Sequence, residues 1–68
     1  MKLDLDNNDI MLLRQQNIRY AKDFEYTEDQ VFKLLDLVHD AEICFAQNES
    51  GCKANAYAKL ADKIQAQI

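Results

Sequence analysis

The chain has 68 residues, with no proline, one glycine and a hydrophobic fraction of 49%. This length and composition fit one helical domain spanning residues 1–68, and they argue against a disordered chain. The formal net charge of −4, from 12 acidic and 8 basic residues, makes nucleic acid an unfavourable partner, because such binding relies on basic surface.

The charge is unevenly distributed. Residues 1–49 hold eleven acidic and five basic side chains, net −6, whereas residues 50–68 hold one acidic and three basic side chains, net +2. This asymmetry favours packing of the last segment within the chain or between subunits. The first residues lack the apolar core of a signal peptide, and no apolar run reaches the roughly 18 residues of a membrane span. We therefore expect a cytoplasmic protein without membrane contact.

The first predicted helix covers residues 7–23. Asp6 is a good N-cap, Asp9 stands at the third helical position, and apolar residues follow at helical spacing. The preceding residues 1–5 contain two leucines in alternation with polar residues. This pattern predicts an arm or a short extended segment before the helix.

The second predicted helix, residues 28–47, has the clearest pattern. Thr27 followed by Gln30 is a capping box. At 100° per residue, the apolar arc covers roughly two-thirds of the circumference, so this helix must be covered from two sides. Its central stripe is Val31, Leu34, Leu35, Val38, Ala41 and Phe45, with Leu37 and Cys44 on one flank and Phe32 and Ile43 on the other.

The third predicted helix covers residues 52–67, after a polar cluster that holds the only glycine. Either Gly51 ends the preceding helix in the left-handed conformation, or Ser50 caps the next one. Short connections make helices antiparallel neighbours. The sequence therefore predicts an all-α fold: a small antiparallel three-helix bundle, or a helical hairpin that dimerises.

The sequence holds no catalytic, metal or cofactor motif. His39 and Cys44 project about 140° apart on a helix, so one chain cannot place both on the same zinc ion, and no CxxC or HxxxH spacing occurs. Cys52 has no histidine near it in sequence to act as a base. We expect no enzyme activity and no cofactor, and both cysteines are expected to be reduced in the cytoplasm.

Three polar residues, Arg14, Asn17 and Glu42, fall inside apolar stripes. In an antiparallel hairpin turning near Tyr26, Arg14 and Glu42 are offset by about 6 Å along the helices. A buried carboxylate without a partner is costly. The sequence therefore predicts a buried Arg14–Glu42 pair with Asn17 close by, and the alternative is a binding site for a basic or polar group.

A self-association surface is predicted on one flank of the second helix. Contiguous exposed apolar surface usually marks an interaction site, and a two-fold dimer is its commonest use. The alternative is that the third helix covers this flank within the chain. The predicted interface residues are Leu12, Leu34, Leu37, Ala41 and Cys44.

These features together predict a small acidic protein–protein interaction module that forms a homodimer. A regulator, an inhibitor or an accessory factor that binds another protein would fit this description. The alternative function is a nucleic-acid-associated regulator that uses Arg14, Arg19 and Lys22, the basic residues nearest the end of the first predicted helix.

Overall fold

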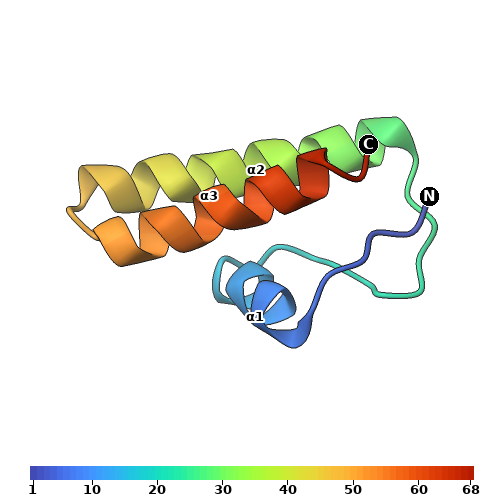
Figure 1. The fold of residues 1–68 in the computed structure, drawn as a ribbon, viewed down its shortest axis with the longest axis horizontal. Helices are drawn as coiled ribbons and strands as arrows, with labels where there is room; N and C mark the ends of the chain where they lie inside the picture. Colours follow the sequence, from blue (N-terminus) through green and yellow to red (C-terminus); the bar gives the residue numbers. More distant parts are fainter.

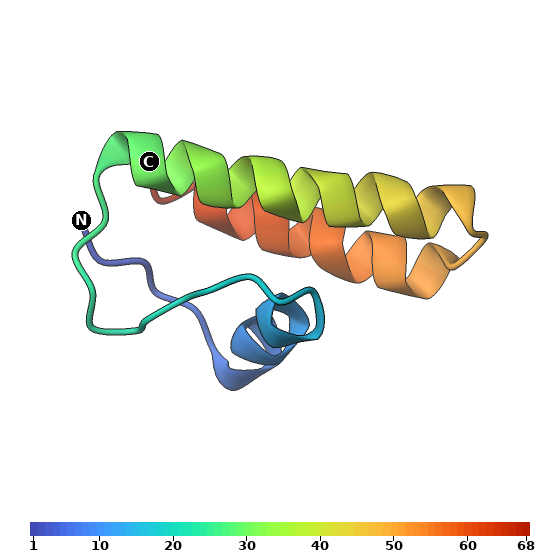
Figure 2. The same ribbon diagram turned by 180° about the vertical axis from the view of Figure 1, so that it is seen from behind.

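The computed structural model describes residues 1–68 as three helices, α1 (Asn7–Gln15), α2 (Glu28–Gln47) and α3 (Gly51–Gln65), with no strand. The α2 and α3 helices lie side by side and antiparallel, whereas α1 is seen end-on below them and crosses the hairpin (Figures 1 and 2). The all-α prediction is confirmed. Of the two predicted arrangements, the antiparallel packing of all three helices is wrong, because α1 crosses the other two, and the helical hairpin is present as α2 and α3.

Capping boxes fix the start of the first two helices. Thr27 Oγ1 accepts a hydrogen bond from the Gln30 N–H at 3.3 Å, and Gln30 Oε1 accepts one from the Thr27 N–H at 3.0 Å. Asp6 and Asp9 make the same reciprocal pair at the start of α1. Both caps were predicted from the sequence, because the side chain and its partner stand three residues apart.

The α1 helix ends at Gln15 and does not continue through the predicted range 7–23. Asn17 adopts a left-handed conformation with φ of 56°, and the Ile18 N–H donates to the Leu13 carbonyl at 2.9 Å. This is a Schellman ending. Glycine is the residue most often found in its left-handed position, and asparagine is also suited to it. Leu13 and Ile18 are both buried, which completes the motif with its usual apolar contact.

The turn between α2 and α3 uses the same ending. Glu49 has φ of 60°, and the Ser50 N–H donates to the Phe45 carbonyl at 2.8 Å. Gly51 is the first residue of α3, and Ser50 stands at the N-cap position without a side-chain hydrogen bond. The left-handed residue is therefore Glu49, and the alternative that assigned this conformation to Gly51 is wrong.

The core contains thirteen buried residues and no buried charged group. The largest share comes from the facing sides of α2 and α3, and the rest comes from the arm, α1 and the segment after it. The buried residues are Val31, Leu34, Leu35, Val38 and Ala41 on α2, Tyr57, Leu60, Ala61 and Ile64 on α3, and Leu3, Leu5, Leu13 and Ile18 elsewhere.

Backbone hydrogen bonds hold the N-terminal arm, residues 1–6, against the rest of the chain. The Tyr26 N–H donates to the Met1 carbonyl at 2.7 Å, and the Met1 nitrogen donates to the Tyr26 carbonyl at 2.8 Å. The Gln67 side chain also bonds to the arm: its Oε1 accepts from the Asp4 N–H at 2.7 Å, and its Nε2 donates to the Asp4 carbonyl at 3.0 Å. The arm is thus an extended part of the fold whose two leucines are buried.

Candidate interaction surface on the second helix

The exposed side of α2 carries three large apolar side chains, Phe32, Leu37 and Ile43, which are 48%, 48% and 53% exposed. At 100° per residue, Phe32 and Ile43 lie about 20° apart around the helix, whereas Leu37 lies about 140° from Phe32. Asp36 and His39 stand between Phe32 and Ile43 and are exposed as well. We call Phe32, Asp36, His39 and Ile43 the outer stripe.

The outer stripe lies on an acidic helix. The α2 helix contains five acidic residues, and Lys33 is its only lysine or arginine. His39 Nδ1 lies 3.4 Å from Glu42 Oε2, with the two side chains 46% and 30% exposed. An exposed pair at this spacing contributes a few tenths of a kcal/mol at most. The outer stripe itself presents the Asp36 carboxylate and the His39 imidazole between two apolar side chains.

The predicted buried pair of Arg14 and Glu42 is wrong. Arg14 and Asn17 are exposed, Glu42 contacts His39, and no charged or polar residue is buried. The prediction assumed a long first helix lying antiparallel to α2. Because α1 ends early and crosses the hairpin, that register does not exist.

Part of the predicted interface belongs to the chain's own core. Leu34 and Ala41 are each 5% exposed, and Leu12 is partly buried against the same core. The ring of Phe45, one turn beyond Ala41, stacks on Tyr57 of α3 at 5.4 Å between centroids. The third helix therefore covers this side of α2, so that Leu34 and Ala41 are not available to a partner.

The other two predicted interface residues, Leu37 and Cys44, are exposed. They provide only one large apolar side chain on their flank. The predicted interface did not include Phe32 and Ile43, which the sequence placed on the opposite flank of the apolar arc. Their separation of eleven residues, which is close to three helical turns, was the available signal that they share one stripe.

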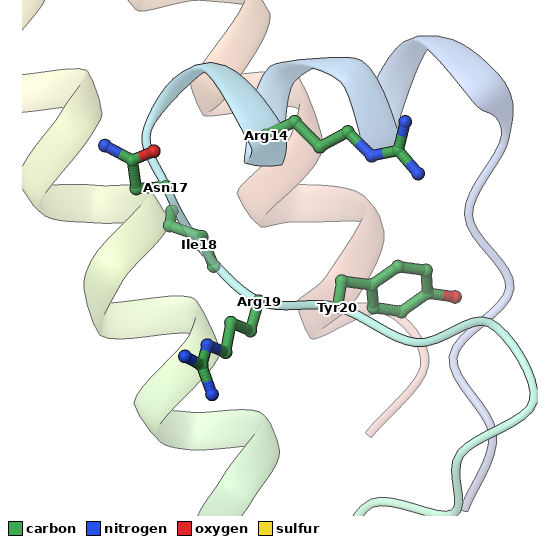
Figure 3. A pocket seen from close by; sticks show the side chains of 5 residues that line it. All are labelled: Arg14, Asn17, Ile18, Arg19 and Tyr20. Carbon is green, nitrogen blue, oxygen red and sulfur yellow. The ribbon is translucent and has the colours of Figure 1, made fainter.

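Two of the three residues predicted for nucleic-acid binding line the same open hollow of about 540 Å³. Figure 3 shows the Arg14 and Arg19 side chains pointing away from each other there, while Lys22 is exposed and does not line it. Two cations thus line one hollow without pointing at a common anion. Its lining residues are Arg14, Asn17, Ile18, Arg19 and Tyr20.

An aromatic cluster lies in the segment between α1 and α2. The Tyr20 and Tyr26 rings are parallel with centroids 6.0 Å apart, and the Phe24 ring meets Tyr26 edge-on at 4.8 Å. The Tyr26 hydroxyl accepts from the Ala21 N–H at 2.9 Å, and the Tyr20 hydroxyl donates to the Leu3 carbonyl at 2.7 Å. These contacts tie the segment and the arm together.

Lys63 joins α3 to the start of α1. Its Nζ lies 2.7 Å from Asp9 Oδ2 and 3.5 Å from Asp6 Oδ2. The hydrogen bond to Asp9 raises the pKa of Lys63, and the hydrogen bond from the Asp9 N–H lowers the pKa of Asp6. All three side chains take part in this link between the ends of two helices.

Cys44 and Cys52 are free and exposed thiols. No three His, Cys, Asp or Glu side chains are grouped so that they could hold a metal ion, and none of the helices is long and apolar enough to cross a membrane. The exposed large apolar side chains make the exposed side of α2 the candidate site. Comparison of the chain with protein-family models, curated proteins and solved structures finds no match.

Proposed function

We propose that this chain is a small acidic protein-interaction module that self-associates through the exposed side of α2. The observation that carries the proposal is that two large apolar side chains, Phe32 and Ile43, lie outside the buried core and are about half exposed on one stripe. Covering the exposed half of each side chain would contribute about 1 kcal/mol. Large apolar side chains at both ends of one exposed stripe favour a protein partner.

The small size of the chain supports the same proposal. A domain of this length buries only about 60% of the surface of its unfolded chain, and oligomerisation is a common way for such domains to gain stability. A module of this kind acts by binding, as a regulator, inhibitor or accessory factor of another protein.

Sedimentation equilibrium tests the self-association. We expect a species of twice the 7.9 kDa chain mass at about 10 µM, a concentration that populates dimers of micromolar or tighter affinity. The dimer should dissociate on dilution, because its population depends on concentration. A 7.9 kDa species that persists across a wide range of concentration would contradict the proposal.

The second candidate function, a nucleic-acid-associated regulator, is favoured by the two arginines that line one hollow. Chromatography on heparin at low salt distinguishes the two candidate functions, because binding to a polyanion such as nucleic acid is strongest at low salt. We expect the chain to pass without retention. Retention that is lost in Arg19→Ala would favour the nucleic-acid function, with Lys59→Ala, an exposed lysine on α3, as the matched control.

A further inference from the structure

We propose that the α2 helices of two copies pair antiparallel through the outer stripe, about a two-fold axis midway between Asp36 and His39. This inference rests on the proposed self-association and adds the register. In that register, Phe32 packs against the partner's Ile43, and Asp36 accepts a hydrogen bond from the partner's His39. The two-fold axis repeats each contact, so the dimer contains two of each.

The spacing of the stripe is the first argument. Its four residues are separated by four, three and four positions, a series that reads the same in both directions. This is the seam spacing of paired helices. A two-fold interface requires a patch that complements itself when turned around, and the outer stripe meets that requirement about its midpoint.

The chemistry of the facing residues is the second argument. Phe32 and Ile43 give an apolar contact at each end, where both side chains are now about half exposed. At the centre, a carboxylate faces an imidazole. His39 contacts Glu42 of its own chain through Nδ1, so donation from Nε2 across the interface uses the imidazolium form, in which both ring nitrogens are donors.

Charge disfavours the parallel arrangement of the same stripe. In parallel helices each residue faces its own copy, so Asp36 would face the partner's Asp36, and like charges disfavour such pairing. In the antiparallel register no carboxylate of the stripe faces another carboxylate. The Asp36 carboxylate therefore favours the antiparallel direction of pairing.

A matched pair of substitutions locates the surface. Phe32 and Leu37 are both 48% exposed, but only Phe32 belongs to the outer stripe. We expect Phe32→Asp to weaken dimerisation at least tenfold in sedimentation equilibrium, and Leu37→Asp to sediment like the unaltered chain. The reverse result would place the dimer on the flank of Leu37 and Cys44, and would overturn the register while the proposed self-association stands.

Disulfide trapping tests the register directly, in a chain that carries Cys44→Ser and Cys52→Ser. We expect a mixture of Phe32→Cys chains and Ile43→Cys chains to form a disulfide-linked heterodimer on mild oxidation. Each variant alone should remain unlinked. Two copies of position 32 lie about 16 Å apart along the paired helices, beyond the roughly 7 Å between Cα atoms that a disulfide spans.

Each outcome of the trapping experiment decides between arrangements. Linking of Phe32→Cys chains to one another, at a rate equal to that of the mixture, would indicate parallel pairing and overturn the inference. Failure of the mixture to link, while the unaltered chain sediments as a dimer, would overturn it as well. A monomeric unaltered chain would contradict the proposed function itself.

Discussion

Asn17 and Glu49, the two non-glycine residues with positive φ, set the ends of α1 and α2. Asparagine visits the left-handed region more readily than most residues, because its short side chain bonds locally. The ending of α1 was therefore readable from the sequence at Asn17. Glutamate has no such advantage, so the polar cluster after Gln47 marked the end of α2, but nothing in the sequence identified Glu49 as the left-handed residue.

Glu49→Gly should raise the free energy of unfolding by roughly 0.5–1 kcal/mol, because relief of left-handed strain exceeds the extra entropy of glycine in the unfolded chain. Urea unfolding followed by circular dichroism measures the change. As the control, Gln47→Gly inside the last turn of α2 should lower stability by about 1 kcal/mol. A loss of stability in both variants would show that the Glu49 side chain contributes an interaction that offsets its strain.

At the scale of the elements, α1 depends on polar links as much as on packing. Its only buried residue is Leu13. The Tyr57 hydroxyl donates to the Leu12 carbonyl at 2.7 Å, and Lys63 holds Asp9 at the other end of the helix. These links attach α1 across the hairpin to α3, which explains how a helix this short keeps a fixed position.

Acid should loosen the attachment of α1. The pKa of Asp6 lies below its ordinary value of 3.8, chiefly because the carboxylate accepts the Asp9 N–H. A carboxyl group whose pKa is lower in the folded chain than in the unfolded chain stabilises the fold at pH values above the unfolded-state pKa. This contribution is lost as the pH falls through the folded-state pKa. Asp6→Asn keeps the cap acceptor without its titration, so its melting temperature should fall less between about pH 5 and pH 2.

Circular dichroism melts of the unaltered chain and Asp6→Asn across that range measure the difference. Equal acid sensitivity would show that the other carboxylates dominate. At alkaline pH the change of stability with pH has the opposite sign, because the pKa of Lys63 is raised above its ordinary value of 10.5. Its contribution is complete at neutral pH and is lost only as pH rises through that higher pKa.

The sequence was sufficient for the bounds of α2, whereas the predicted range of α1 ran past the end signal at Asn17. The α2 helix spans the predicted range 28–47, since a capping box and a strong period mark it locally. The predicted range 7–23 was too long, because apolar residues after Asn17 continued the helical spacing by chance. Those residues instead form the aromatic cluster that receives the arm, a long-range contact that local spacing does not encode.

At the scale of the whole molecule, the position of α3 around α2 decides which apolar side chains of α2 remain on the surface. The period of α2 showed that two flanks needed cover, but it does not tell which flank α3 takes. The structure places Leu34 and Ala41 in the core, and it leaves Leu37 exposed on one flank and Phe32 and Ile43 exposed on the other. Exposed apolar residues on α2 were therefore predictable, and the division between core and surface was not.

The arm is part of the single core. Leu3 and Leu5 are each 2% exposed, so Leu5→Ala should lower the free energy of unfolding by about 2–5 kcal/mol. That is a large share of the roughly 5–15 kcal/mol that stabilises a domain. Chemical denaturation measures it, with Lys2→Ala at an exposed arm position as the control. Equal midpoints for both variants would show that the arm adds nothing to the core.

The same arrangement sets the order of events in folding. The α2 and α3 helices meet across the turn at residues 48–50, so their pairing closes a short loop and costs little chain entropy. The arm must find Tyr26 and Gln67, which are far along the chain, and such distant contacts close late. Contacts that form after the transition state act on the rate of unfolding. Leu3 and Leu5 therefore govern the lifetime of the folded chain more than the speed at which it forms.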